Sequence, residues 1–81
     1  MDALDQGRSA FTRQAWADAV TRLSEAGRMA PLEPDDLERL AAAAFLTGRD
    51  AESAEAWARA HHELLARGEP RRAARCAIWL G

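Results

Sequence analysis

Several residue types are absent or rare in this chain of 81 residues. Lysine, asparagine and tyrosine are missing, so every strongly basic side chain is an arginine. The one cysteine, Cys76, has no partner for an internal disulfide, which excludes a small secreted domain held together by disulfides. No apolar run approaches the ~18 residues that a membrane span needs, and the N-terminus is acidic where a signal peptide would be basic. We therefore expect a soluble cytoplasmic domain.

The overall charge and composition narrow the class further. The formal net charge is −2, whereas a dedicated nucleic-acid-binding domain usually has a clear basic excess. Apolar residues make up 48% of the chain, which is ordinary for a folded domain. Alanine is abundant and isoleucine occurs once, a composition typical of coding in a high-GC bacterial genome. These features predict one small globular domain.

Prolines and glycines divide the chain into helical segments. The breaks fall at Pro31 to Pro34, at Gly48 and at Gly68 to Pro70, with a weaker one near Gln14. Because β-branched residues are few and no alternating pattern persists, no segment is expected to be a strand. We predict an all-α fold of about five helices, over residues 2–12, 15–27, 34–47, 50–67 and 70–80.

Helical spacing also predicts the buried faces. One apolar stripe lies on the second segment, at Trp16, Ala19, Val20, Leu23 and Ala26, and another on the fourth, at Ser53, Trp57, Ala60 and Leu64. Pro34 suits the first position of the third helix, and Gly48 suits its end. Asp50 is expected to cap the N-terminus of the fourth helix.

The chain repeats itself at regular intervals. Ala10-Phe11, Ala44-Phe45 and Ile78-Trp79 are equally spaced, and at the same interval Ala19, Leu23 and Ala26 match Ser53, Trp57 and Ala60. Gln14 takes the turn position of the first unit that Gly48 takes in the second. The period is about 34 residues, which indicates stacked helical hairpins.

These residues resemble the tetratricopeptide repeat (TPR) family, whose unit is a helix-turn-helix of about 34 residues. The second half of the motif has a small residue, three spacers, a large apolar residue and then another small residue. These positions are Ala19, Leu23 and Ala26 in the first unit, and Ser53, Trp57 and Ala60 in the second. In the first half of the motif Gly7 keeps the glycine, which Ala41 replaces in the second unit. The resemblance implies TPR-like stacked hairpins: repeat one over about 1–31, repeat two over about 34–67, and the first helix of a third over about 69–81. Two explanations stay open for that last helix: the chain is a piece of a longer repeat protein, or the helix is a terminal cap.

The stretches LERLAAAAFLTGRDAESAEAWARAH and GEPRRAARCAIWLG are similar to the N-terminal repeat regions of bacterial LuxR-type transcription regulators. In those proteins a C-terminal helix-turn-helix binds DNA, and no such segment is recognised here. The resemblance implies a non-enzymatic module whose partner is a protein segment or another domain of the parent protein. TPR domains that grip a peptide's carboxylate use lysine and asparagine, which this chain lacks.

The aromatic positions of the repeat give the first candidate site. In TPR-like folds the first helices line a groove, so Phe11, Ala42, Phe45 and Trp79 are candidates for a partner-binding surface. The alternative, which we favour at this point, is that the aromatics pack in the core between successive first helices. The apolar fifth helix is also a candidate surface for a homodimer.

A basic cluster on the fifth segment gives the second candidate. Arg71, Arg72 and Arg75, with Arg67 nearby, could contact an acidic surface or belong to a small helix-turn-helix DNA-binding domain. We favour a solvated face balanced by Glu63 and Glu69. Adjacent His61 and His62 point about 100° apart on a helix and are expected at the surface, not on a metal. Cys76 has no base beside it in the sequence, and we predict no catalytic, metal or cofactor site.

Overall fold

The computed structural model describes residues 2–80, and the side chains of residues 2–76. These residues form helices α1 (Ala3–Thr12), α2 (Trp16–Met29), α3 (Pro34–Leu46), α4 (Asp50–Ala66) and α5 (Pro70–Leu80), and none of them forms a strand. The prediction of an all-α fold with about five helices is confirmed. The main difference in length is α2, which continues beyond its predicted end at Gly27 to Met29.

The helix starts differ in how they are capped. Asp2 caps α1, because its Oδ1 accepts a hydrogen bond of 2.8 Å from the backbone N–H of Asp5. Pro34 is the first residue of α3, as predicted. The prediction for Asp50 is wrong: Arg49 occupies the N-cap position without a side-chain bond, and Asp50 is already helical. Asp50 contributes instead as an acidic residue of the first turn, where the helix dipole favours negative charge.

Three helices end in the same kind of turn. The residue after the C-cap has a positive φ in each, 62° at Gln14, 76° at Gly48 and 73° at Gly68. In each turn this residue donates to the carbonyl three positions back, and the next residue donates to the carbonyl five back: Ala15 to Ala10, Arg49 to Ala44 and Glu69 to Leu64. This is the Schellman arrangement. The predicted equivalence of Gln14 and Gly48 is therefore present in the backbone.

The core consists of small and branched apolar side chains around one tryptophan. Nearly all positions of the two predicted stripes are buried, and only Trp16 is partly exposed. Small residues allow close contact between helices: a Cβ on Gly7 would lie 2.7 Å from Leu23 Cδ2, and Ser53 Oγ donates a 2.8 Å hydrogen bond to the carbonyl of Ala41. Gly7 and Ala41 hold equivalent places in successive repeats, so both hairpins use this position for contact between their helices.

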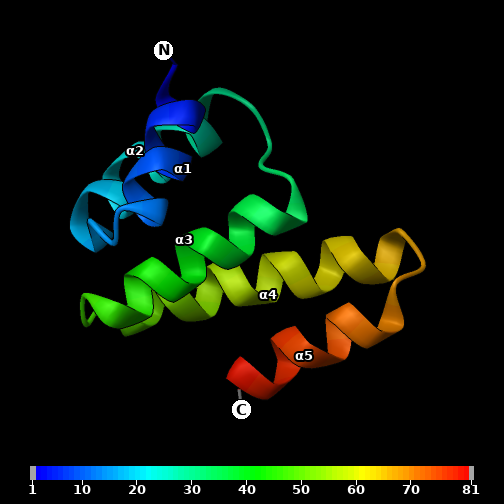
Figure 1. Ribbon diagram of the computed structural model, residues 1–81. Coiled ribbons are helices and arrows are strands. Elements are labelled where there is room, and N and C mark those ends of the chain that lie inside the picture. The colour runs from blue at the N-terminus through cyan, green and yellow to red at the C-terminus, as the bar shows by residue number, and fades with distance from the viewer. Residues whose placement is uncertain (1, 81) are drawn as a thin grey trace.

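Helix α3 is covered on two sides. Figure 1 shows it crossing between the α1–α2 hairpin and α4, while α5 lies against α4. Asp36, Leu40 and Ala43, spaced by four and three residues, share one face by helical geometry, and Leu37, Ala41 and Ala44 share the next. All six are buried. No helix within residues 2–80 is both long and apolar enough to cross a membrane.

Candidate functional site

Ion pairs link the first helices of the successive hairpins. Arg8 of α1 donates to both carboxylate oxygens of Asp36 on α3, at 2.9 and 2.7 Å. Arg72 of α5 donates to Asp35 and Glu38 of α3, and Arg75 bonds the other oxygen of Glu38 at 2.9 Å. Ion pairs therefore link α1 to α3 and α3 to α5, which is the order of these first helices along the chain.

Asp36 is the most deeply buried of these charges. Its side chain is 1% exposed, and it accepts a further bond of 3.0 Å from Arg39. The hydrogen bonds from Arg8 hold the pKa of Asp36 below its ordinary value, against the opposing effect of burial. No pattern noted in the sequence indicated this pair. The available signal was its spacing from Leu40 and Ala43, which places it on a buried face.

A hollow of about 330 Å³ lies where these helices meet, which we call the first-helix hollow. Its apolar lining is Phe11, Ala42 and Trp57, and its charged lining is Asp35, Glu38, Arg39, Arg72 and Arg75. Phe11 is partly buried and packs edge-on against Trp16, with ring centroids 5.2 Å apart. The hollow therefore combines an apolar floor with charged walls whose arginines are paired to carboxylates.

The structure separates the predicted groove residues. Phe11 and Ala42 line the first-helix hollow, whereas Phe45 does not and is 52% exposed. The interpretation of the aromatics as core is therefore wrong for Phe45, because α3 ends at the next residue and leaves about half of this side chain uncovered. The side chain of Trp79 lies outside the described residues. Trp57, which the sequence analysis assigned to the core alone, also contributes to the lining.

The predicted basic cluster is largely neutralised. Arg72 and Arg75 pair with the α3 carboxylates, and Arg72 also approaches Glu69 at 3.7 Å. Arg67 pairs with Glu63 and, at 2.7 Å, with Glu33. The predicted balance by Glu63 and Glu69 is confirmed, and the pairing with α3 is new. Arg71 is exposed and makes no ion pair within the described part of the chain.

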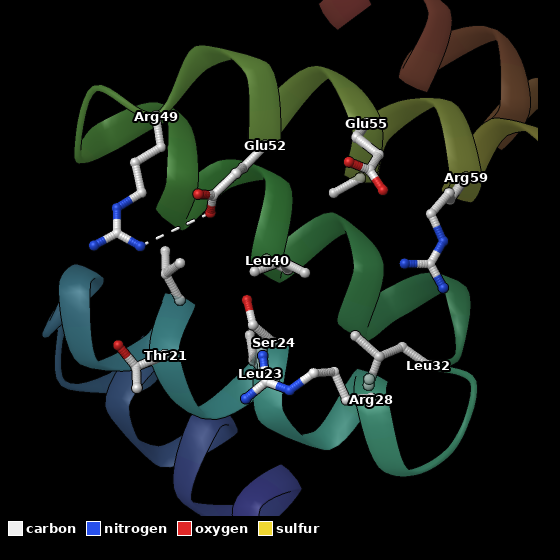
Figure 2. A pocket seen from close by; sticks show the side chains of 13 residues that line it. Thr21, Leu23, Ser24, Arg28, Leu32, Leu40, Arg49, Glu52, Glu55 and Arg59 are labelled. Atoms are coloured by element: carbon white, nitrogen blue, oxygen red, sulfur yellow. Dashed lines mark ion pairs between the residues drawn. The ribbon is translucent and has the colours of Figure 1, made fainter.

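A larger hollow of about 490 Å³ opens between α2 and α4, and we call it the second-helix hollow. Its floor includes Leu23, Leu32, Leu40 and Ala56, and Figure 2 shows arginines on both sides of it. Arg28 extends from α2, Arg59 extends from α4, and Arg49 pairs with Glu52 at 3.8 Å. Leu40 lies about 200° around α3 from Glu38, so the two hollows open on opposite sides of α3.

His61 and Cys76 both contribute to the α4–α5 contact. His61 Nδ1 lies 2.6 Å from the carbonyl of Ala73, and it must carry the proton because a carbonyl oxygen only accepts. His61 is thus half-buried, in contrast to its predicted surface position, while His62 is exposed as predicted. Cys76 is buried, and burial raises the pKa of its thiol, so it is held protonated. Among the described residues no group of three His, Cys, Asp or Glu side chains is placed to hold a metal ion.

Comparison with known proteins adds no relative. No protein-family model, curated protein or solved structure matches this chain.

Proposed function

We propose that this chain is a non-enzymatic protein–protein interaction module of the TPR-like type, acting in the cytoplasm as the N-terminal part of a bacterial LuxR-type transcription regulator. Its partner is a peptide segment of another protein or of the same regulator. The support comes from the hairpins, from the repeated turn at Gln14 and Gly48, and from the order of the linked helices. The TPR and LuxR parts of the proposal rest on the motif residues and stretches quoted above.

The observation that carries the proposal is the first-helix hollow. It lies on the side of the molecule where α1, α3 and α5 are held together by ion pairs, and it offers an apolar floor at Phe11, Ala42 and Trp57. Because Arg72 and Arg75 are already paired with Asp35 and Glu38, the hollow offers little free charge for a phosphate backbone. The hollow is better suited to an apolar side chain of a partner segment. Polar groups on either side of that side chain would then take over some of the hydrogen bonds of these ion pairs.

A selection from a displayed peptide library tests this function. We expect enriched peptides to carry an apolar anchor residue and to bind the purified chain in solution. Ala42→Arg places a long side chain into the hollow and should weaken binding of a selected peptide at least ~10-fold, the change expected when an anchor residue is lost. The matched control is Ala54→Arg, because Ala54 is exposed on α4 and does not line the hollow.

Two results would contradict the proposal. One is a library selection that enriches nothing over an unrelated helical protein, and the other is equal binding by Ala42→Arg and the wild-type chain. The regulator assignment has a separate check in the gene: reading on past the codon for Gly81 should give further TPR-like repeats and then a helix-turn-helix.

A further inference from the structure

Two arginines of the second-helix hollow, Arg28 and Arg59, pair with no acidic group of the described residues. Twelve close ion pairs involve most of the arginines in the described residues, yet none involves Arg28 or Arg59. The spacing on α4 would have allowed Arg59 to pair with Glu55 or Glu63, four residues away on either side. Arg59 instead extends toward the hollow, as Arg28 does from the facing helix (Figure 2).

The second-helix hollow also has apolar lining residues, beside the polar and charged Thr21, Ser24, Arg49, Glu52 and Glu55. Leu32 and Leu40 are buried overall yet form part of the hollow's surface, and Ala56 adds a small side chain on α4. At about 490 Å³ the hollow falls within the ~300–1,000 Å³ typical of sites that take a small ligand or a few side chains. Its shape therefore provides an apolar floor with a guanidinium group on each wall.

We infer that the second-helix hollow binds an acidic peptide segment, which places an apolar side chain on Leu32 and Leu40 and carboxylates at Arg28 and Arg59. Guanidinium groups form strong, often bidentate hydrogen bonds with carboxylates. Glu52 and Glu55 also line the hollow, and they disfavour a dense anion such as a nucleic-acid backbone. A segment with spaced carboxylates avoids that repulsion. This site is separate from the first-helix hollow, on the other side of α3.

A designed peptide tests the inference directly. The probe is a short fluorescein-labelled peptide in which leucines are flanked by glutamates, and its counterpart has lysines in place of the glutamates. We expect the glutamate peptide to raise the fluorescence anisotropy saturably, more weakly in about 0.5 M NaCl because the ion pairs are screened. The lysine peptide should not bind.

Charge reversal locates the site. Arg28→Glu with Arg59→Glu should weaken binding of the glutamate peptide at least ~10-fold, since both carboxylate contacts become repulsive. Arg71→Glu is the matched control: Arg71 is exposed, makes no ion pair with the described residues and lies outside the hollow. It changes the net charge in the same direction and should leave binding within about twofold of wild type.

The inference is overturned if the glutamate peptide does not bind, if the double variant binds it as well as Arg71→Glu does, or if the lysine peptide binds equally. Chemical-shift mapping on the wild-type chain avoids any dependence on the variant's folding. Shifts at Ser24, Leu32 and Ala56 support it, and shifts confined to Phe11 and Ala42 overturn it and point to the first-helix hollow instead. Binding of labelled duplex DNA that is lost in the double variant would also overturn it, in favour of a nucleic-acid site.

Discussion

At the scale of single residues, the tightest contact in the first hairpin is made by Gly7. A methyl group there would lie 2.7 Å from Leu23 Cδ2 and Cγ and 3.1 Å from the Leu23 backbone nitrogen. Leu23 is fully buried and cannot move away without disturbing the core. We expect Gly7→Ala to destabilise the chain by about 1–3 kcal/mol through overpacking, despite the better helix propensity of alanine. Urea unfolding, monitored by circular dichroism, measures the free energy of unfolding of the variant and of the wild-type chain.

Gly27 provides the matched control for Gly7. It also lies within a helix, but a Cβ there would meet its nearest neighbour, Leu32 Cδ1, at 3.4 Å, an ordinary contact. Gly27→Ala should therefore be neutral or stabilise the chain by up to about 1 kcal/mol through helix propensity. If Gly7→Ala and Gly27→Ala change the free energy of unfolding by the same amount, the inference that α1 and α2 are in tight contact at Gly7 is wrong.

The buried carboxylate of Asp36 makes part of the stability depend on pH. Its pKa is lowered in the folded chain by the hydrogen bonds from Arg8, so the folded state binds this proton less readily than the unfolded state. The stabilisation is fully present above the ordinary aspartate pKa of about 3.9 and is lost as the pH falls through the lower, folded value. At pH 7, Asp36→Asn should cost about 1.5–3 kcal/mol, the range for hydrogen bonds to charged groups.

The difference between Asp36→Asn and the wild-type chain should shrink as the pH is lowered from 7 toward 2. Denaturant unfolding at several pH values gives the curve. Asp18→Asn serves as the control, because Asp18 is exposed and its pairs with Arg13 and Arg22 are long, at 3.9 and 3.6 Å. A cost of Asp36→Asn that is independent of pH would contradict the role given to the ion pair with Arg8.

At the scale of helices and turns, the three Schellman turns give paired predictions of opposite sign. Gly48 has a φ of 76° and nothing within 4 Å of the place a Cβ would take, so Gly48→Ala should cost about 1 kcal/mol from backbone strain alone. Gln14 already bears that strain at a φ of 62°. Gln14→Gly relieves it and should leave stability unchanged or raise it by up to about 1 kcal/mol. Thermal unfolding of both variants decides this, and a loss of stability in Gln14→Gly would contradict it.

The sequence was sufficient for most of the helices and for the repeat, because both follow from local patterns. Pro34, Gly48 and Gly68 mark boundaries by their backbone preferences, and the apolar stripes follow from helical geometry. Even the unusual turn at Gln14 followed from its place one repeat before Gly48. Local patterns thus specify the hairpins.

The contacts between hairpins were not predictable in the same way. The pairing of Arg8 with Asp36 spans 28 residues, and that of Arg75 with Glu38 spans 37. Long arginine side chains reach several carboxylates, and the choice depends on how the helices stack, which no local pattern specifies. The same holds for Phe45, whose exposure depends on where α3 ends relative to its neighbours, and for His61, whose partner is a backbone carbonyl on α5.

At the scale of the whole molecule, α3 supports two different surfaces. Its Ala42 side lies in the first-helix hollow, where charges are matched within the chain, and Leu40 lies in the second-helix hollow, where two arginines are unmatched by any described residue. The ion pairs of the first-helix hollow hold the helices in order, while Arg28 and Arg59, which pair with no described residue, are the groups that we propose to contact a partner. The first surface thus depends on assembly of the repeats, and the second on two adjacent hairpins alone.

This arrangement predicts which part of the molecule opens first. Within the described residues α5 packs mainly on α4. Its side chains reach α3 through Arg72, which bonds Asp35 and Glu38, and through Arg75, which bonds Glu38. Glu38→Gln removes the negative charge of the carboxylate that Arg72 and Arg75 share. We expect amide hydrogens of α5 to exchange up to about fivefold faster, equivalent to at most about 1 kcal/mol for partly exposed ion pairs. Exchange rates of the amides of α1 and α2 should be unchanged.

Glu55→Gln is the control, since Glu55 makes no ion pair with the described residues and lies in the second-helix hollow. Equal acceleration in all helices would mean that the chain opens only as a single unit, and no acceleration in α5 would mean that Glu38 does not hold it.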